Sequence, residues 1–267
     1  FYDDFRGFGK LDATGIGATD STYDADERGI VDVALKSLLQ NGSQNGYANF
    51  LTAGADNASG VILSQLASES SGVIRVTGND ADNDESILQY GTAGCVKINK
   101  AANDPKVLAF EARFRKPDVG DNEVGMFLGL ASEALNSAAA ILTDDDAAMA
   151  DIDHIGFHVD QADGDALDFV YTKAGQTDTI QIAGVQALST TDTWYKVGFL
   201  LNPGAPPANR IRIFVDNVEQ STYVTETEVA ASDFPEDEEM TLTWATKTGA
   251  AAAKQVDLDW WAVGQAH

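Results

Sequence analysis

The chain has 267 residues and a formal net charge of −25, because 42 Asp and Glu outnumber 17 Lys and Arg. A field of that sign repels nucleic acid and anionic membrane surfaces, so neither is expected as a partner. The length suits one large β domain or two smaller domains with their own cores. We interpret the acidic excess first as a means of solubility or of tolerance to salt, with divalent-cation binding as the alternative.

Residues that often carry covalent chemistry are few. Cys95 is the only cysteine, so no intrachain disulfide can form, and the histidines are His154, His158 and His267. A catalytic thiol needs a neighbouring base, and none stands near Cys95 in the sequence. No signal peptide is recognisable, and no apolar run approaches the ~18 residues of a membrane span. We therefore expect synthesis in a reducing cytoplasm.

The first 55 residues carry the weakest pattern. The stretch "IVDVALKSLLQNG" fits a short helix or an irregular strand, and its pattern does not separate the two. From about residue 60 onward the dominant period is two, as in "KVLAFEARFRK", where Leu108, Phe110 and Phe114 alternate with Arg113 and Arg115. The same alternation predicts strands in "EVGMFLGLAS", "HIGFHVD", "ALDFVYTK", "TWYKVGFLL" and "RIRIFVDN".

Turn residues separate these strands. Asp163-Gly164 and Ala174-Gly175 each follow a strand, and Asp216-Asn217 fits a tight hairpin because Asn tolerates positive φ. "NPGAPPAN", with three prolines, predicts a looser connection. Many short strands with frequent turns favour an antiparallel sandwich. We find no repeat and no linker, so we expect a single β-sandwich domain over residues 1–267, with its best-supported core at 105–265.

One long excursion interrupts the strands. "SEALNSAAAILTDDDAAMADID", residues 132–153, is rich in Ala and then acidic, and has room for one helical turn. Loops of that length inside a compact domain are often functional.

The succession "TWYKVGFLL", "RIRIFVDNVEQ", "MTLTWATKTG" and "VDLDWWAVGQ" resembles the concanavalin A-like lectin/glucanase fold, as seen in laminin G-like domains. In that superfamily a W-Y-K-V strand precedes a strand ending in a V-D-G/N-V hairpin, and a V-D-x-x-x-V strand closes the chain. "FYDDFRGF" also looks like the Asp-Asp-Phe opening of many such chains. The resemblance implies an all-β fold, an antiparallel two-sheet jelly-roll sandwich, and it supports fold much better than function.

Within that superfamily the chain looks most like acidic proteins of tailed-phage virions. The segments "GVIRVTGNDADNDESILQYG", "LAFEARFR", "GFHVDQADGDALDFV" and "FPEDEEMTLTWATKTG" carry this likeness in that order. The resemblance implies a structural or decoration component of a virus particle.

An enzyme of this superfamily would need particular side chains on one strand. Retaining glucanases carry Glu-x-Asp-x-x-Glu or Glu-x-Asp-x-Glu, with two carboxyls about 5 Å apart. In "DIDHIGF", Asp151 and Asp153 occupy two of these positions, but Ile155 or Gly156 stands where the third acid belongs. His154 and His158 share one side of the strand, either as a lyase base or metal pair or, as we prefer, as polar residues of an outward face. We predict no catalytic residues and no enzyme activity.

Acidic runs suggest calcium sites without specifying one. "NDADNDE" begins like an EF-hand loop, but Glu85 and Gly91 occupy the positions that need Gly and a bidentate Glu. Two other runs could supply irregular oxygen ligands or be solvated turns: Asp144, Asp145 and Asp146, and Asp160, Asp163 and Asp165. No Cys/His spacing suggests zinc. We predict no cofactor, with calcium as the alternative.

Two adjacent tryptophans are the last candidates for a functional site. In "VDLDWWAV" the strand period sends Trp260 and Trp261 to opposite faces, so one indole leaves the core. It could lie beneath another layer, anchor a subunit interface or stack on a sugar.

We therefore predict a non-catalytic structural protein of a phage virion, acting as a capsid decoration or cement protein. It would be made in the host cytoplasm, lie on the capsid surface, contact the major capsid protein lattice and form a homo-oligomer. A carbohydrate-binding or tail-associated receptor-binding module is the alternative, with a glycan as partner, and a polysaccharide-degrading enzyme comes third.

Overall fold

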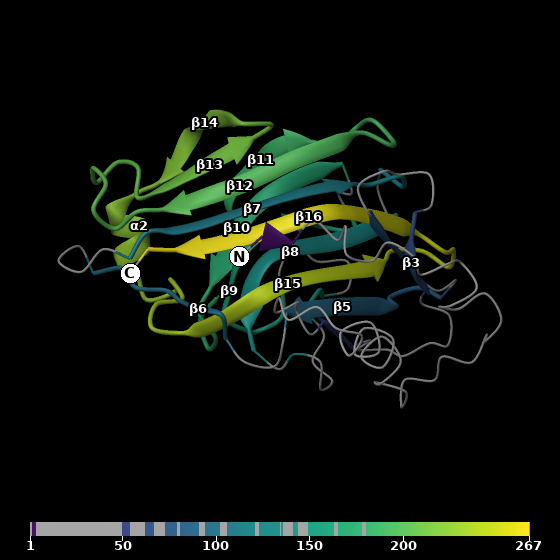
Figure 1. Cartoon of the computed structure of the whole chain (residues 1–267), viewed down its shortest axis with the longest axis horizontal. Coiled ribbons are helices and arrows are strands. Elements are labelled where there is room, and N and C mark those ends of the chain that lie inside the picture. Colours follow the sequence, from purple (N-terminus) through teal and green to yellow (C-terminus); the bar gives the residue numbers. More distant parts are fainter. Residues whose placement is uncertain are drawn as a thin grey trace, which may run out of the picture.

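The computed structural model describes residues 2–3, 50–53, 62–66, 73–78, 81–90, 94–101, 106–120, 123–133, 135, 141–143, 149–162, 165–177 and 180–266. Nearly all of its regular structure is antiparallel β-sheet, arranged in two stacked layers (Figure 1). The predicted all-β two-sheet sandwich is confirmed. The interpretation of "IVDVALKSLLQNG" as a helix or strand falls outside the described residues.

We refer to the two layers as sheet A and sheet B, and to the side of each that points away from the other as its outer face. Sheet A runs in the order β14 (Val218–Val224), β13 (Ile211–Val215), β12 (Trp194–Leu201), β7 (Leu108–Arg115), β16 (Gln255–Gln265), β4 (Ile74–Thr77) and β3 (Ile62–Gln65), with β1 (Tyr2–Asp3) pairing with β16.

Sheet B runs in the order β11 (Ile180–Ala187), β10 (Ala166–Thr172), β9 (His154–Val159), β8 (Val124–Ser132), β15 (Glu239–Thr248), β5 (Glu85–Tyr90) and β2 (Phe50–Ala53), with β6 (Val96–Lys97) pairing with β15. Strands that precede residue 105 thus belong to both layers. That the whole chain forms one domain stays a prediction.

Alternation along the strands builds the core between the sheets. In β7 the apolar positions are buried and the intervening charged ones are partly exposed. Phe110 and Phe199 from sheet A stack at 5.5 Å between ring centroids, and Phe199 lies 5.5 Å from Phe169 of sheet B. Aromatic rings so spaced bury large apolar areas and hold the layers in register.

The hairpin between β13 and β14 forms as predicted. Asp216 and Asn217 have φ values of 48° and 68°, the left-handed conformation that a two-residue type I′ turn requires. The Asp216 carboxylate accepts a hydrogen bond of 2.9 Å from the backbone N–H of Lys196, which ties the turn to β12.

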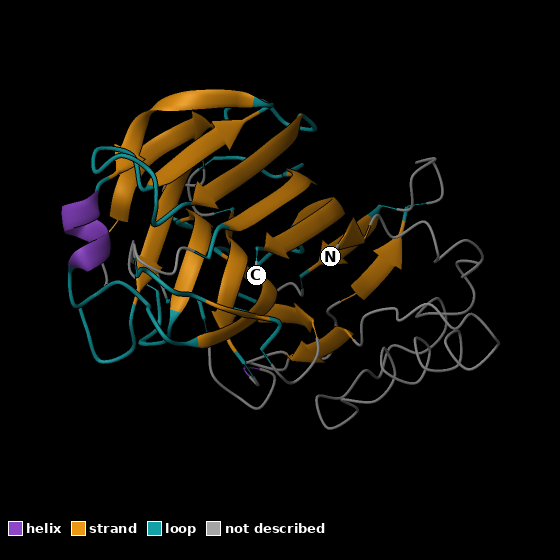
Figure 2. Ribbon diagram, turned by 60° about the vertical axis from the view of Figure 1, so that its left-hand side comes forward, coloured by secondary structure: helices purple, strands orange, loops and turns teal. Residues whose placement is uncertain are grey.

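A single short helix, α2 (Glu226–Ala230), stands at one end of the described sandwich (Figure 2). Thr225 and Glu228 form a reciprocal capping box at its N-terminus. No helix in the described ranges has the length and apolar character needed to cross a bilayer.

Sheet B departs from the simple alternating pattern. Every residue of β9 and all but one of β8 are buried, so its outer face is covered as well as its inner one. The cover comes from the excursion after β8, whose Leu135, Ile141, Leu142 and Met149 form a second apolar cluster against Phe127 and its neighbours on the outer face. The excursion therefore completes the packing of sheet B.

Candidate functional site

The two carboxylates of "DIDHIGF" shape a turn. Both precede β9, which begins at His154. Asp151 accepts a hydrogen bond of 2.5 Å from the backbone N–H of Gly175, and Asp153 accepts one of 3.0 Å from that of Ala174. Ile155 is fully buried in the core. These carboxylates thus hold the turn after β10, and no third acid stands beside them on β9.

The two histidines face away from the core, as the strand period predicts, but they are not exposed as an outward position would suggest. His154 and His158 are both buried, because the excursion lies over this part of sheet B. His154 Nδ1 lies 2.9 Å from the carbonyl oxygen of Ile152, and its ring meets Phe127 edge-on at 5.8 Å. Burial beneath the chain's own residues argues against contact with an external substrate.

Two charged side chains of sheet B form hydrogen bonds with the backbone of the excursion. Glu85 and Lys247 are partners across β5 and β15, and both are buried. One Glu85 oxygen accepts hydrogen bonds from the N–H groups of Ile141 (2.8 Å) and Leu142 (3.1 Å), while Lys247 Nζ donates to the Leu142 carbonyl at 3.0 Å. We call this the Glu85–Lys247 clamp. It satisfies the backbone polar groups that the excursion brings into an apolar setting.

The calcium candidates are only partly placed. Asp144, Asp145, Asp146 and Asp163 lie outside the described residues. Asp160 accepts a hydrogen bond of 2.9 Å from the N–H of Ala162, and Asp165 is exposed. Among the described residues no three His, Cys, Asp or Glu side chains come together as a metal site would require.

Trp260 and Trp261 lie on opposite sides of sheet A. Trp261 is fully buried in the core, whereas Trp260 is partly exposed on the outer face, where Lys196 Nζ lies 5.6 Å above its ring. The register between β16 and β7 shifts between Leu258 and Trp260, a β-bulge at Asp259. Of the two, Trp260 is therefore the one that a partner can reach.

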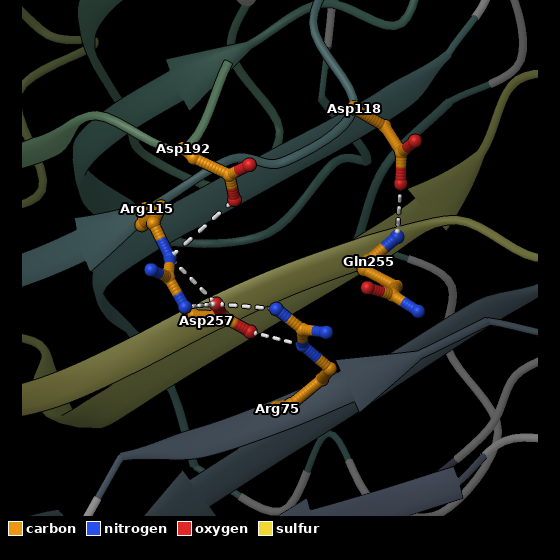
Figure 3. A network of polar contacts seen from close by, with 6 residues as sticks. All are labelled: Arg75, Arg115, Asp118, Asp192, Gln255 and Asp257. Carbon is orange, nitrogen blue, oxygen red and sulfur yellow. Dashed lines mark hydrogen bonds and ion pairs between the residues drawn. The ribbon is translucent and has the colours of Figure 1, made fainter. Parts of the chain in front are cut away.

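A network of charges crosses the outer face of sheet A (Figure 3). Asp257 on β16 has no exposed side-chain surface and lies between Arg75 of β4 and Arg115 of β7. Arg75 Nε and Nη2 donate to its two oxygens at 2.6 and 2.8 Å, and Arg115 Nε and Nη2 both donate to Oδ2, at 2.8 and 2.5 Å. The hydrogen bonds that Arg75 donates to the Asp257 carboxylate raise the pKa of Arg75 above its ordinary value.

Trp194 of β12 extends this network. The guanidinium carbons of Arg113 and Arg115 lie 4.5 and 4.6 Å from the centre of its indole, within range of cation–π attraction. Arg113 also pairs with Asp259. We call the surface that holds these groups the Arg–Trp face; its residues are Arg75, Arg113, Arg115, Trp194, Lys196, Arg212, Phe214, Tyr223 and Trp260.

Solved structures resemble this chain at low sequence identity. Peanut lectin, solved with a nine-residue peptide, is 13% identical over 85% of this chain and 95% of its own, with a TM-score of 0.50. The carbohydrate recognition domain of Emp47p is 12% identical over 79% and 90%, at 0.49. A carbohydrate esterase of the Shiga toxin-encoding bacteriophage phi24B is 16% identical over 82% and 90%, at 0.42.

At such identities the likeness concerns the fold alone, and it rests on peanut lectin. The chain has a concanavalin A-like fold. No protein-family profile matches the sequence, and no curated protein matches it either.

The features of this concanavalin A-like sandwich that sequence reasoning missed are long-range pairings. Alternation places Arg113 and Arg115 on a polar face, but their carboxylate partners lie 146 and 142 positions away in the chain. In the sequence, Trp194 is recognisable only as part of the fold signature. The sequence does hold one signal for these ion pairs, the alternating acids Asp257 and Asp259 in "VDLDWW". Opposite charges on the polar face of a sheet pair across neighbouring strands.

Proposed function

We propose that this concanavalin A-like sandwich is a non-catalytic binding protein that acts by adhesion. One observation carries this proposal: the outer face of sheet B, where the sequence offered its candidate acids and histidines, is filled by the chain's own excursion. Ile141 and Leu142 are buried there, anchored by the Glu85–Lys247 clamp. The candidate carboxylates Asp151 and Asp153 are engaged in a turn. A hydrolase would need them near a reacting sugar.

We further propose that the protein is a structural component of a phage virion, made in the host cytoplasm and bound on the capsid surface as a decoration or cement protein. The sequence likeness to acidic virion proteins supports this role. Its partner would be the lattice of the major capsid protein. Many copies on one lattice make individually weak contacts collectively strong, through effective concentration. The acidic remainder of the surface would face solvent.

Glycan binding is the second candidate function, and Trp260 is the observation that favours it. A partly exposed indole on a β-sheet can stack against a sugar ring. A lectin also shares the fold. On this alternative the Arg–Trp face would be a sugar platform.

Co-sedimentation with purified empty capsids or expanded heads tests the first proposal. We expect stoichiometric, saturable binding to the capsid and no saturable signal on a glycan array. Absence of capsid binding together with saturable glycan binding would replace the decoration role with the second candidate. Turnover of a β-glucan or alginate that Asp153→Asn abolishes would overturn the non-catalytic proposal itself.

A further inference from the structure

The Arg–Trp face has an unusual composition for this chain. The chain contains four tryptophans; Trp244 and Trp261 are buried in the core, and the other two, Trp194 and Trp260, both lie on this face. Four of its seven arginines also lie there: Arg75, Arg113, Arg115 and Arg212. Trp and Arg are the residues most enriched among the energetic centres of protein–protein interfaces.

The charge of the Arg–Trp face also differs from that of the rest of the chain. Its five cations pair with Asp257, Asp259, Glu111 and Glu219, and Asp192 adjoins Arg115 at 3.9 Å. These ion-paired groups, five cations and five carboxylates, balance to zero, whereas the whole chain carries −25. Most of the excess negative charge therefore lies elsewhere, and two copies that meet through this face bring little net charge into contact.

The side chains of this face are held in place before any partner arrives. Asp257 is fully buried between two guanidiniums, and Arg113 and Arg115 both rest on the Trp194 ring. Ordering a long side chain on binding costs about 0.5–1.5 kcal/mol. Side chains already fixed by hydrogen bonds avoid most of that cost, which suits a recognition surface.

The Arg–Trp face has the extent and shape of a small protein contact. It extends over six adjacent strands, from β14 to β4. With strands about 4.8 Å apart and about 3.4 Å per residue, it measures about 24 by 20 Å. Stable protein interfaces bury about 800 Å² per partner, and small ligands prefer concave sites. The flat area of this sheet face is about 480 Å², and projecting side chains add to it. Such a broad, flat surface fits a modest protein contact better than a sugar site.

We propose that the Arg–Trp face is the contact between two copies of this chain, related by a two-fold axis. A two-fold contact presents the same patch on both sides, so a near-neutral mosaic of cations and carboxylates can set opposite charges against each other. The remainder of the surface is acidic on average, so contact through it would bring like charges together. This pairing goes beyond the proposed adhesion to capsids and does not depend on it.

Sedimentation equilibrium of the full chain tests the pairing. We expect a dimer at micromolar concentration whose association strengthens between low and moderate salt, because salt screens repulsion between two copies of charge −25. Trp260→Ser and Phe214→Ser should each raise the dimer dissociation constant at least about tenfold. Val218→Ser is the matched control: Val218 is 63% exposed, lies on the adjacent hairpin strand and faces the other side of sheet A, and this change should leave the constant within about twofold.

Trp260→Phe keeps an aromatic ring at the same position, and it should retain most of the association if the variants act through the interface and not through the fold. A monomer at hundreds of micromolar, or a dimer that Trp260→Ser leaves intact, would overturn the proposal. So would a wild-type monomer whose binding to a glycan is lost in Trp260→Ser, which would assign the face to sugar. Capsid binding is read separately, by co-sedimentation, so the two proposals fail independently.

Discussion

Asp257 and Arg115 are register partners across β16 and β7, and the buried Asp257 carboxylate accepts two hydrogen bonds from that arginine while it accepts two more from Arg75. The three strands β7, β16 and β4 are thus joined by one carboxylate as well as by their backbone ladders. A buried charge of this kind is tolerated only because its partners neutralise it.

Removal of the Asp257 charge is predicted to destabilise the sandwich. In Asp257→Asn both guanidiniums lose their counter-charge, and we expect the free energy of unfolding to fall by about 2–4 kcal/mol, since breaking a buried pair leaves charge uncompensated. Urea denaturation measures the change. Glu219→Gln is the control, because the Arg212–Glu219 pair is about one-third exposed on both sides and should contribute less than about 1 kcal/mol. Equal losses in the two variants would contradict this account.

Lys116 is predicted to make stability depend on pH. Its side chain is buried at the end of β7, where Nζ donates to the Val124 carbonyl at 2.7 Å, and burial lowers its pKa from 10.5 to about 7. Between those values the unfolded chain binds the proton and the folded one does not, so stability rises with pH from about 7 to 10.5, by up to about 1.4 kcal/mol per pH unit. Below pH 7 both states are protonated and the contribution is absent.

Lys116→Met should remove that slope, measured by denaturation at a series of pH values. Lys173→Met, at a side chain one-third exposed, should keep it. A variant at Lys116 with an unchanged pH profile would show that the lysine remains charged in the fold.

The Glu85–Lys247 clamp is predicted to control exposure of the excursion. Glu85→Ala removes the acceptor of two backbone hydrogen bonds, and we expect the Ile141 and Leu142 amides to exchange at least about tenfold faster with solvent. Hydrogen exchange resolved by residue measures this. Gln89→Ala provides a comparison, since Gln89 accepts from the Leu135 amide and should act at that end of the excursion instead. Uniform acceleration across sheet B would mean global destabilisation and not local release.

An added methyl group should destabilise the protein at one glycine and have almost no effect at another. A Cβ on Gly129 would lie 2.4 Å from the Ile155 carbonyl oxygen and 2.7 Å from the Gly156 Cα, both backbone atoms of the adjacent strand. We expect Gly129→Ala to lower the free energy of unfolding by about 2–4 kcal/mol, as overpacking forces strands apart. Gly264→Ala meets nothing within 4 Å and should change it by less than about 0.5 kcal/mol. Thermal denaturation of the two variants side by side distinguishes the sites.

The sequence predicted the side on which most strand residues lie, because that depends only on a local period of two. The places of Ile155 in the core and of Trp260 and Trp261 on opposite sides follow from it. The Asp216-Asn217 turn follows from an equally local property, the tolerance of Asn for positive φ. It did not predict the burial of His154 and His158, because the residues that cover them come from a loop without a repeating pattern.

Partners far apart in the chain also escaped prediction. Nothing near Arg75 in sequence indicates that Asp257, 182 positions later, will be its counter-ion. The Glu85–Lys247 clamp is similar: in the sequence Glu85 belongs to a stretch that begins like a calcium loop, and only the pairing of β5 with β15 brings it beside Lys247. Such contacts depend on topology, which alternation alone does not specify.

The bulge at Asp259 lets β16 keep large apolar side chains in the core both before and after it, which an unbroken strand would not allow. Val256 and Leu258 point inward, so strict alternation would next send Trp260 to the interior and turn Trp261 and Val263 outward. The additional residue shifts the alternation by one position. It thereby places Trp261 and Val263 inside, which together are larger than Trp260 and Ala262. A chain shortened by Asp259 alone would keep every neighbouring side chain on its present side of the sheet, but Arg113 would lose its carboxylate partner. The one additional residue therefore serves the interior through its length and the outer face through its charge.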